Sequence, residues 1–342
     1  MKFSGSYDSS DVTFCIDPLL ANASDDAEAL LRAHAPHPVS GYDQLFLAAC
    51  LRNGQLVAGD VVRIARGLAQ RPGEIVIVSL MCAGTPLAIL VHRALKMLGR
   101  SSVHYSVSTV RGRGLDRRGL DYILARHQPH SLVFFDGWTG KGSISAELRH
   151  SAHGYLTLAG SRLKVQLAVL SDLAGAADLA GSSADYLIPS AMHRAVVNGL
   201  VTNSQAAAEE ADFDRCFYLP ELAEHDLSRW FVDRLSVFVK QAMARDCGQP
   251  VSMLSRQSHQ LQSNRFVWSC EQRYRARSSQ AVMPGVNEAT RALLTRTTPM
   301  ILLLKCRDAA DTLHLSLLAE AAGHETIIDS LLPYQAAVIL RS

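Results

Sequence analysis

The middle of the chain alternates short apolar runs with stretches whose apolar residues recur at helical spacing. The apolar runs cover residues 74–80, 103–110, 131–135 and 164–170, and the helical patterns cover residues 86–99, 117–127 and 143–154. Strands that alternate with helices of this length predict βαβ units and an α/β fold with a mostly parallel sheet. Because ligands of such sheets bind beyond the carboxyl ends of the strands, the segments that follow the apolar runs are the first candidates for a site.

The flanks of this α/β region predict a helical cap and a smaller second unit. Residues 1–72 have mostly helical patterns, clearest at 42–52 and 59–70, and an amphipathic helix is predicted over 227–243, before the break at Gly248-Gln-Pro250. We expect a main unit over 1–248, a basic linker over 249–282 and a small α/β unit over 283–342. The expected elements of the small unit are helices at 286–296 and 308–322 and strands at 299–305, 326–328 and 336–340.

The predicted linker is basic and contains aromatic residues. Its charged and aromatic members are Arg256, Arg265, Arg273, Arg275 and Arg277, the single acid Glu271, and Phe266, Trp268 and Tyr274, so five positive charges minus one negative charge give +4. Such a segment can contact phosphates and stack on bases, which predicts RNA contact through residues 249–342. A solvated connector with a few anchoring aromatics explains the same pattern. Beyond the linker, five basic residues against six acids give −1, which adds no electrostatic support for nucleic-acid binding.

Composition and cysteine spacing exclude several classes of protein. With 48% apolar residues, 19% charged residues and a formal net charge of +2, the chain is typical of globular proteins, and no partner follows from its charge. The seven cysteines form no C-x-x-C pair, which argues for reduced thiols and against a disulfide framework or a structural zinc site. The sequence has no signal-peptide pattern and no apolar run near the roughly 18 residues of a membrane span. We therefore expect a cytoplasmic protein without a membrane partner.

The strongest candidate site is the segment Asp136-Gly-Trp-Thr-Gly-Lys-Gly-Ser143, which follows the third apolar run. The strand places Asp136 at the carboxyl edge of the sheet, where its carboxylate can accept hydrogen bonds from sugar hydroxyls. In the loop, glycines let backbone N–H groups close on an anion, hydroxyl side chains donate, the lysine adds a charge, and the next helix points its positive end at the same place. The loop residues of this candidate phosphate site are Thr139, Gly140, Lys141, Gly142 and Ser143. The spacing is that of neither a Walker A loop nor a dinucleotide-binding loop, and a glycine-rich turn without a ligand is the alternative.

A second candidate loop follows the first apolar run. Cys82, Ala83, Gly84 and Thr85 precede Pro86, which suits the first turn of a helix. Small residues at a helix start favour anion binding, although a well-capped helix explains the same residues.

A third candidate loop follows the second apolar run and contains two arginines between glycines, Arg111 and Arg113. Such a loop can close over a polyphosphate and exclude water, while a solvated turn is the alternative for this loop alone. Three such loops at the ends of neighbouring strands favour one shared site for a phosphorylated ligand.

Two weaker signals concern metal and thiol chemistry. Glu221 with His225, and His150 with His153, have helical spacings that can bind a metal, but exposed helix faces produce these spacings freely. Cys82 is a possible nucleophile, although the sequence identifies no histidine partner for it and a small, partly buried thiol is the default.

Motifs along nearly the whole chain resemble one family of phosphoribosyltransferase-like proteins, encoded near bacterial tellurite-resistance and stress operons and also labelled cysteine protease StiP. The three loops are similar to the signatures of type I phosphoribosyltransferases. The stretches that resemble the family are Gly5-Ser-Tyr, Asp11-Val-Thr-Phe14, Val78-Ser-Leu, Ala83-Gly-Thr-Pro86, His104-Tyr-Ser, Arg111-Gly-Arg-Gly-Leu-Asp116, Phe135-Asp-Gly-Trp-Thr-Gly-Lys-Gly142, Tyr218-Leu-Pro-Glu-Leu222, Asp226-Leu-Ser-Arg229 and Pro284-Gly-Val-Asn-Glu-Ala-Thr290.

The resemblance implies a type I phosphoribosyltransferase-like domain, followed by a small Pelota-type RNA-binding domain. It implies an enzyme that uses phosphoribosyl pyrophosphate, Mg²⁺ and a base-like acceptor to make a nucleoside-like stress metabolite, and that forms a homodimer. By resemblance, Asp136 contacts the ribose hydroxyls and the metal, residues 139–143 hold the 5-phosphate, and residues 82–85 hold the pyrophosphate. Arg111 and Arg113 would close over it as catalytic residues.

Two departures from the family pattern leave other functions open. Asp136 is followed by Gly137 where the transferase motif has a second acid, and Cys82 stands where the family often has an arginine. A non-catalytic regulator that binds nucleotides or RNA is one alternative. A cysteine hydrolase that uses Cys82 is the other.

Overall fold

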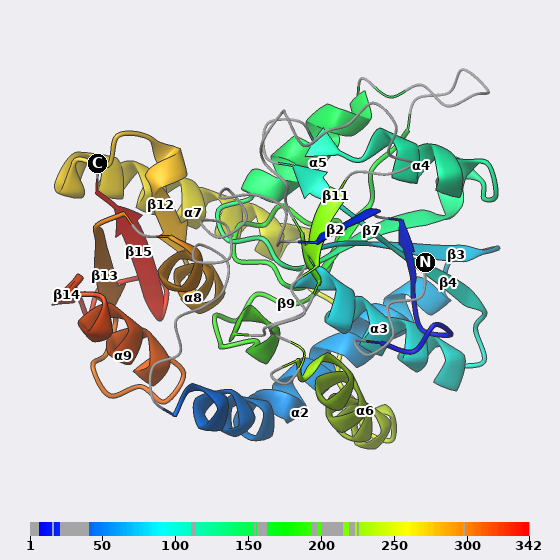
Figure 1. The fold of residues 1–342 in the computed structure, drawn as a ribbon, viewed down its shortest axis with the longest axis horizontal. Helices are drawn as coiled ribbons and strands as arrows, with labels where there is room; N and C mark the ends of the chain where they lie inside the picture. Colours follow the sequence, from blue (N-terminus) through cyan, green and yellow to red (C-terminus); the bar gives the residue numbers. More distant parts are fainter. Residues whose placement is uncertain are drawn as a thin grey trace.

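The computed structural model describes residues 7–15, 17–20, 41–81, 83–110, 114–153, 155, 163–192, 197–199, 215–218, 223, 226–296 and 298–341. Its centre is a six-stranded sheet with the order β1-β4-β3-β7-β8-β9, in which all neighbouring pairs are parallel (Figure 1). The strands are β1 (Thr13–Cys15), β3 (Ile75–Leu80), β4 (Ser102–Val107), β7 (Leu132–Trp138), β8 (Leu167–Ser171) and β9 (Leu179–Ser182). The predicted α/β class with a mostly parallel sheet is confirmed.

Helices cover both faces of this sheet. The helices between the central strands are α3 (Gly84–Met97), α4 (Arg117–Leu124) and α5 (Ser143–His153), close to the predicted ranges. On β3, Ile75 and Ile77 belong to the same core cluster as α3, whereas Val76 and Val78 belong to the cluster that contains α4 and α5. Both faces of the strand are therefore buried, which explains why its sequence is apolar at every position except Ser79.

The direction of the chain along the sheet reverses between β3 and β7. From β3 the chain passes through α3 to β4 on one side, and it then returns through α4 to β7 on the other side of β3. The segments that leave β3 and β7 run to helices on opposite faces, α3 and α5. The crevice between two such segments is where open α/β sheets bind their ligands.

The N-terminal flank contains one long helix rather than the two that the pattern predicts. Helix α2 (Tyr42–Ala69) continues through Gly54 and packs against α3 and α6 (Ser228–Met243). A Cβ atom at Gly54 would lie 2.6 Å from the Phe238 ring of α6, so this glycine allows close helix packing and does not end the helix. Among the described helices, α2 is long and apolar enough to cross a membrane by length and composition, yet 61% of the relevant window is buried inside the protein. That burial is expected of a core helix.

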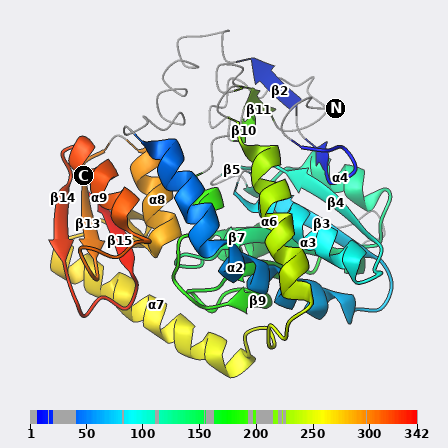
Figure 2. The same cartoon turned by 90° about the horizontal axis from the view of Figure 1, so that it is seen from below.

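The C-terminal part forms a second, smaller α/β unit. Its sheet has the order β12-β15-β13-β14, and helices α8 and α9 pack with it, while α7 contacts β12 (Figure 1). Its elements are β12 (Val282–Pro284), α8 (Val286–Thr295), β13 (Met300–Leu304), α9 (Leu313–Ala321), β14 (Glu325–Ile328) and β15 (Ala336–Leu340). The stretch predicted as a linker contains helix α7 (Met253–Tyr274) and the short turn η5 (Ser279–Ala281). Figure 2 shows α7 extending from the side of β9 to the C-terminal sheet.

Two small sheets and two short turns complete the described structure. Strands β2 (Asp17–Leu20), β10 (Val197–Gly199) and β11 (Arg215–Tyr218) form one sheet, and β5 (Thr109–Val110) pairs with β6 (Gly114–Leu115) in a hairpin. The turns are η2 (Pro129–Ser131) and η3 (Pro189–Met192). Both α8 of the C-terminal unit and α2 of the main unit pack against η3. The hydrophobic core of the C-terminal unit is therefore continuous with that of the main unit.

Candidate functional site

Asp136 lies near the end of β7, at the switch point of the sheet, which is the place between β3 and β7 where the direction of the chain along the sheet reverses. Its side chain is half-buried, and one carboxylate oxygen accepts a hydrogen bond of 2.7 Å from the N–H of Gly137. Burial raises the pKa of Asp136 to about 7, the Gly137 N–H opposes this rise, and the nearby carboxylate of Glu288 adds to it. The side chain can therefore exchange a proton near neutral pH.

The loop after β7 has the backbone shape that its glycines allow. Gly140 and Gly142 have φ angles of 54° and 86°, and the N–H of Gly142 donates to the carbonyl of Thr139 at 2.7 Å. These φ values favour glycine because a Cβ atom would strain the backbone. Ser143 then begins α5, whose first N–H groups have no partner within the helix itself. This arrangement presents backbone donors and the positive end of a helix to an anion.

The hydroxyl of Thr139 is engaged inside the protein rather than offered to a ligand. It donates to Asp172 at 2.8 Å and accepts from the N–H of Ala174 at 3.1 Å. Asp172 is buried and also accepts from the N–H groups of Ala176 and Ala177. Thr139 thus ties the loop after β7 to the loop after β8. A phosphate at this loop would depend on backbone N–H groups and Ser143 instead of the Thr139 hydroxyl.

The loop after β3 meets the end of β7 directly. A Cβ atom at Gly84 would lie 3.0 Å from the carbonyl oxygen of Phe135 and 3.3 Å from Oδ1 of Asp136, so only a glycine allows this approach. The hydroxyl of Thr85 is buried and lies 2.8 Å from that of Ser106, beneath the loop. Of this predicted group, Gly84 contacts the strand end and Ala83 lies beside it in sequence, while Cys82 is outside the described residues.

The third predicted loop is described only at its base. Arg111 and Arg113 lie outside the described residues, and the β5–β6 hairpin flanks them. Gly114 packs directly against Ser151 of α5, the helix that begins at the end of the loop after β7. Asp116 then caps α4 by accepting from the N–H groups of Arg118 and Gly119 at 2.9 and 3.1 Å.

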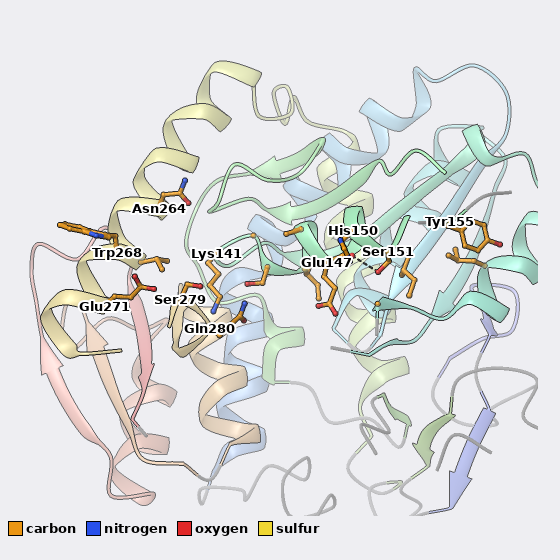
Figure 3. A pocket seen from close by; sticks show the side chains of 18 of the residues that line it. Lys141, Glu147, His150, Ser151, Tyr155, Asn264, Trp268, Glu271, Ser279 and Gln280 are labelled. Carbon is orange, nitrogen blue, oxygen red and sulfur yellow. Dashed lines mark hydrogen bonds between the residues drawn. The ribbon is translucent and has the colours of Figure 1, made fainter. Parts of the chain in front are cut away.

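A cleft of about 1320 Å³ extends from the loop of residues 139–143 between α5 and α7 (Figure 3). Lys141, Gly142 and Ser143 line it, and Trp268, a residue that is 64% exposed, lines one side from α7. The other polar residues that line the cleft include Glu147, His150, Asn264, Glu271, Ser279 and Gln280. An exposed indole close to amide side chains and an anion-binding loop suits a ligand with a flat base and a phosphate.

The C-terminal unit reaches the same loop, which the sequence did not predict. Oε1 of Glu288, in the first turn of α8, accepts a hydrogen bond of 2.9 Å from Nε1 of Trp138. Nζ of Lys141 donates to the carbonyl of Val282 at 2.7 Å, so this predicted phosphate ligand also holds β12. The motif 284–290 contains Glu288, but in the sequence it was only a point of family resemblance, and no local pattern relates it to Asp136.

The described residues include the His150 and His153 pair and several buried thiols. Within them, no three His, Cys, Asp or Glu side chains gather as a metal site would require, and Glu221 and His225 lie outside them. Burial raises the pKa of Cys15, Cys50 and Cys270 to about 12, which makes these thiols unreactive.

Known proteins provide a further comparison. Residues 5–236 match the family model described as tellurite-like stress resistance cysteine protease StiP, and residues 261–342 match the PELOTA RNA binding domain. A relative named cysteine protease StiP, from Acinetobacter baylyi, is 34% identical over 365 aligned positions, which cover 99% of this chain and 94% of that protein. A mutant hypoxanthine phosphoribosyltransferase from Trypanosoma cruzi, solved with its product IMP, aligns with a TM-score of 0.29 and 13% identity over 57% of this chain and 89% of that chain. The length and identity of the sequence matches show that the chain, whose residues 261–342 match the Pelota model, belongs to the StiP family.

Proposed function

We propose that the chain is an enzyme of the phosphoribosyltransferase type, which binds phosphoribosyl pyrophosphate and transfers its phosphoribosyl group to a base-like acceptor. The main support is that two glycine loops meet at one carboxylate. Gly84 packs on the strand that carries Asp136, and the loop 139–143 leaves the same strand two residues later. The meeting point is the switch point of the sheet, where such folds bind ligands.

Each part of the substrate has a matching group at this point. The 5-phosphate would bind to the N–H groups of residues 140–143 and the start of α5, with Lys141 adding positive charge. The pyrophosphate would lie at the start of α3, near Ala83 and Gly84. Arg111 and Arg113, which lie in the sequence between β5 and β6, are proposed to close over the pyrophosphate.

The proposed reaction exchanges one bond at the anomeric carbon. A nitrogen of the acceptor bonds to C1 while the bond from C1 to the diphosphate oxygen breaks, so that pyrophosphate leaves with the electron pair and the nitrogen releases its proton. Asp136 accepts a hydrogen bond only from Gly137 in the described part of the chain, so it fits a role as an acceptor for ribose hydroxyls and as a ligand for Mg²⁺. Bound Mg²⁺ would neutralise charge on the diphosphate. The nucleoside-like stress metabolite and the homodimer are proposed from the family resemblance alone.

Calorimetry with phosphoribosyl pyrophosphate and Mg²⁺ tests the proposal. Asp136→Ala and Gly140→Asp should abolish binding, because the first removes the sugar contact and the second puts a negative charge in the phosphate loop. Gly323→Asp is a matched control, since Gly323 also has a positive φ of 67° but has no atom within 4 Å of its Cβ position. Unchanged affinity in both site variants would refute the proposal.

A non-catalytic regulator that binds nucleotides or RNA is the second candidate, and the cleft beside α7 favours it. Trp268 is exposed there, between Asn264 and Glu271 on the same helix face, as Figure 3 shows. If this function is correct, fluorescently labelled single-stranded RNA should bind to the wild type and lose roughly ten-fold in affinity with Trp268→Ala. Pyrophosphate release with any base in a panel would favour the enzyme instead.

A cysteine hydrolase is the third candidate, and the name of the Acinetobacter baylyi relative favours it. In the sequence, Cys82 falls between the end of β3 at Leu80 and the start of α3 at Gly84, and the starts of helices are among the places where reactive cysteines occur in proteins. Rapid labelling of Cys82 by iodoacetamide, together with peptide hydrolysis that is lost in Cys82→Ala, would support this function. A Cys82 thiol that is inert to labelling would count against it.

A further inference from the structure

A carboxylate from the C-terminal unit lies against the proposed phosphate loop. A Cβ atom at Gly140 would be 2.6 Å from Cγ and 2.9 Å from Cδ of Glu288, so the missing side chain of Gly140 makes room for Glu288. Trp138 holds the same carboxylate through its Nε1 at 2.9 Å. The loop and the strand end before it therefore both contact Glu288.

The position of Glu288 is fixed by contacts at the start of α8. Asp185 accepts from the N–H of Val286 at 2.9 Å and from that of Gln335 at 2.7 Å. The next residue, Asn287, donates to the carbonyl of Tyr186 and accepts from the N–H of Ile188. These contacts set the register of α8 against the main unit. Glu288, one residue further along, is presented to the loop by a rigid element.

Glu288 and Asp136 have few partners of their own. In the described part of the chain, Glu288 accepts only from Trp138 and Asp136 only from Gly137, and no hydrogen bond or ion pair joins either carboxylate to a basic side chain. Two neighbouring carboxylates without a shared cation repel each other. Both carboxylates are partly exposed and have acceptor positions left for a ligand, and sugar hydroxyls can donate to them.

We propose that Glu288 positions the substrate by accepting a hydrogen bond from a ribose hydroxyl of the phosphorylated sugar, opposite Asp136. This role rests on the proposed function and extends it, because part of the sugar site then comes from the unit that matches the Pelota family. It also gives the docking of that unit a direct effect on sugar binding.

Calorimetry with ribose 5-phosphate and with inorganic phosphate, both in EDTA, tests this role without any metal. Glu288→Gln keeps the size of the side chain and an oxygen for Trp138, but it removes the charge. We expect ribose 5-phosphate to bind roughly ten-fold more weakly, since a hydrogen bond to a charged group is lost, and inorganic phosphate to bind as it does to the wild type. The control is Glu320→Gln, an exposed glutamate on α9 whose replacement should change neither affinity.

Two results would overturn this role. One is an unchanged or higher affinity of Glu288→Gln for ribose 5-phosphate, and the other is an equal loss for both ligands, which would indicate a purely structural contact. If Glu288→Gln does not fold, Trp138→Phe is a second variant, which retains the carboxylate of Glu288 but removes its hydrogen-bond donor. It should weaken the binding of ribose 5-phosphate and leave that of inorganic phosphate unchanged. If the wild type binds neither ligand, the proposed function fails together with this role. Normal wild-type binding with an unaffected Glu288→Gln refutes the role alone.

Discussion

Replacing Asp136 with Asn should stabilise the protein more at pH 8 than at pH 5. Burial raises the pKa of Asp136 from 3.8 to about 7 in the folded protein. Since the folded state binds this proton more tightly than the unfolded chain, the contribution of Asp136 to stability is complete below pH 3.8 and is lost as the pH rises through about 7. Asn resembles the protonated acid in size and charge, so it does not lose this contribution.

The two pKa values set an upper limit on the effect. Each tenfold change in proton affinity corresponds to about 1.4 kcal/mol, so the interval from 3.8 to about 7 gives at most about 4 kcal/mol. The side chain is only half-buried, and solvent screening reduces the effect. We therefore expect Asp136→Asn to raise the free energy of unfolding by about 1 to 2 kcal/mol at pH 8.

Urea denaturation of both proteins at pH 5 and pH 8 measures this difference. Burial also raises the pKa values of Asp60 and Asp185 to about 6, but these groups titrate equally in the wild type and the variant. The difference between the two proteins therefore isolates Asp136. A stability difference that is the same at both pH values, or that is larger at pH 5, would refute the assigned pKa and its cause.

Three further predictions concern close packing and the anchoring of the loop after β7. Gly140→Ala should destabilise the protein by about 2 kcal/mol, because the alanine strains the backbone and its methyl group meets Glu288. In a Glu288→Ala background the same change should cost only about 1 kcal/mol, and equal costs in urea titrations would exclude the contact. Gly54→Ala should lower the melting temperature by several degrees because its methyl group meets Phe238. In a Phe238→Ala background, Gly54→Ala should lower the melting temperature much less. Asp172→Asn should cost about 1 to 3 kcal/mol and weaken phosphate binding, since the loop after β7 loses a charged anchor, which thermal melts with and without phosphate would detect.

The elements around the sheet could be predicted because local pattern and global position agree in them. The run that became β3 is apolar at every position except Ser79, since both faces of the strand are buried, and α3 and α5 begin where small residues follow a strand. Strand β9 was not predicted, because Leu179–Ser182 is short and contains the small residues Ala180 and Gly181. Gly181 is needed because Asp60 of α2 packs on it, a contact between distant segments that no local pattern reveals.

The candidate site could be predicted in its backbone but not in its side-chain partners. The positive φ angles of Gly140 and Gly142 follow from local turn chemistry, so the loop was visible in the sequence. The engagement of Thr139 by Asp172 depends on the pairing of β7 with β8, and Glu288 reaches the loop only after the C-terminal unit has docked. Contacts between segments 33 and 150 residues apart have no local signature in a single sequence.

The continuous core has a calorimetric consequence. Met283, Val286 and Leu302 of the C-terminal unit belong to the same buried cluster as Val57 of α2 and Ile188. If the C-terminal unit melted alone, these side chains and their partners in the main unit would enter water together, at about 25 cal/mol for each Å² exposed. The two units should therefore unfold in a single cooperative heat-absorption peak, although separate family models match them.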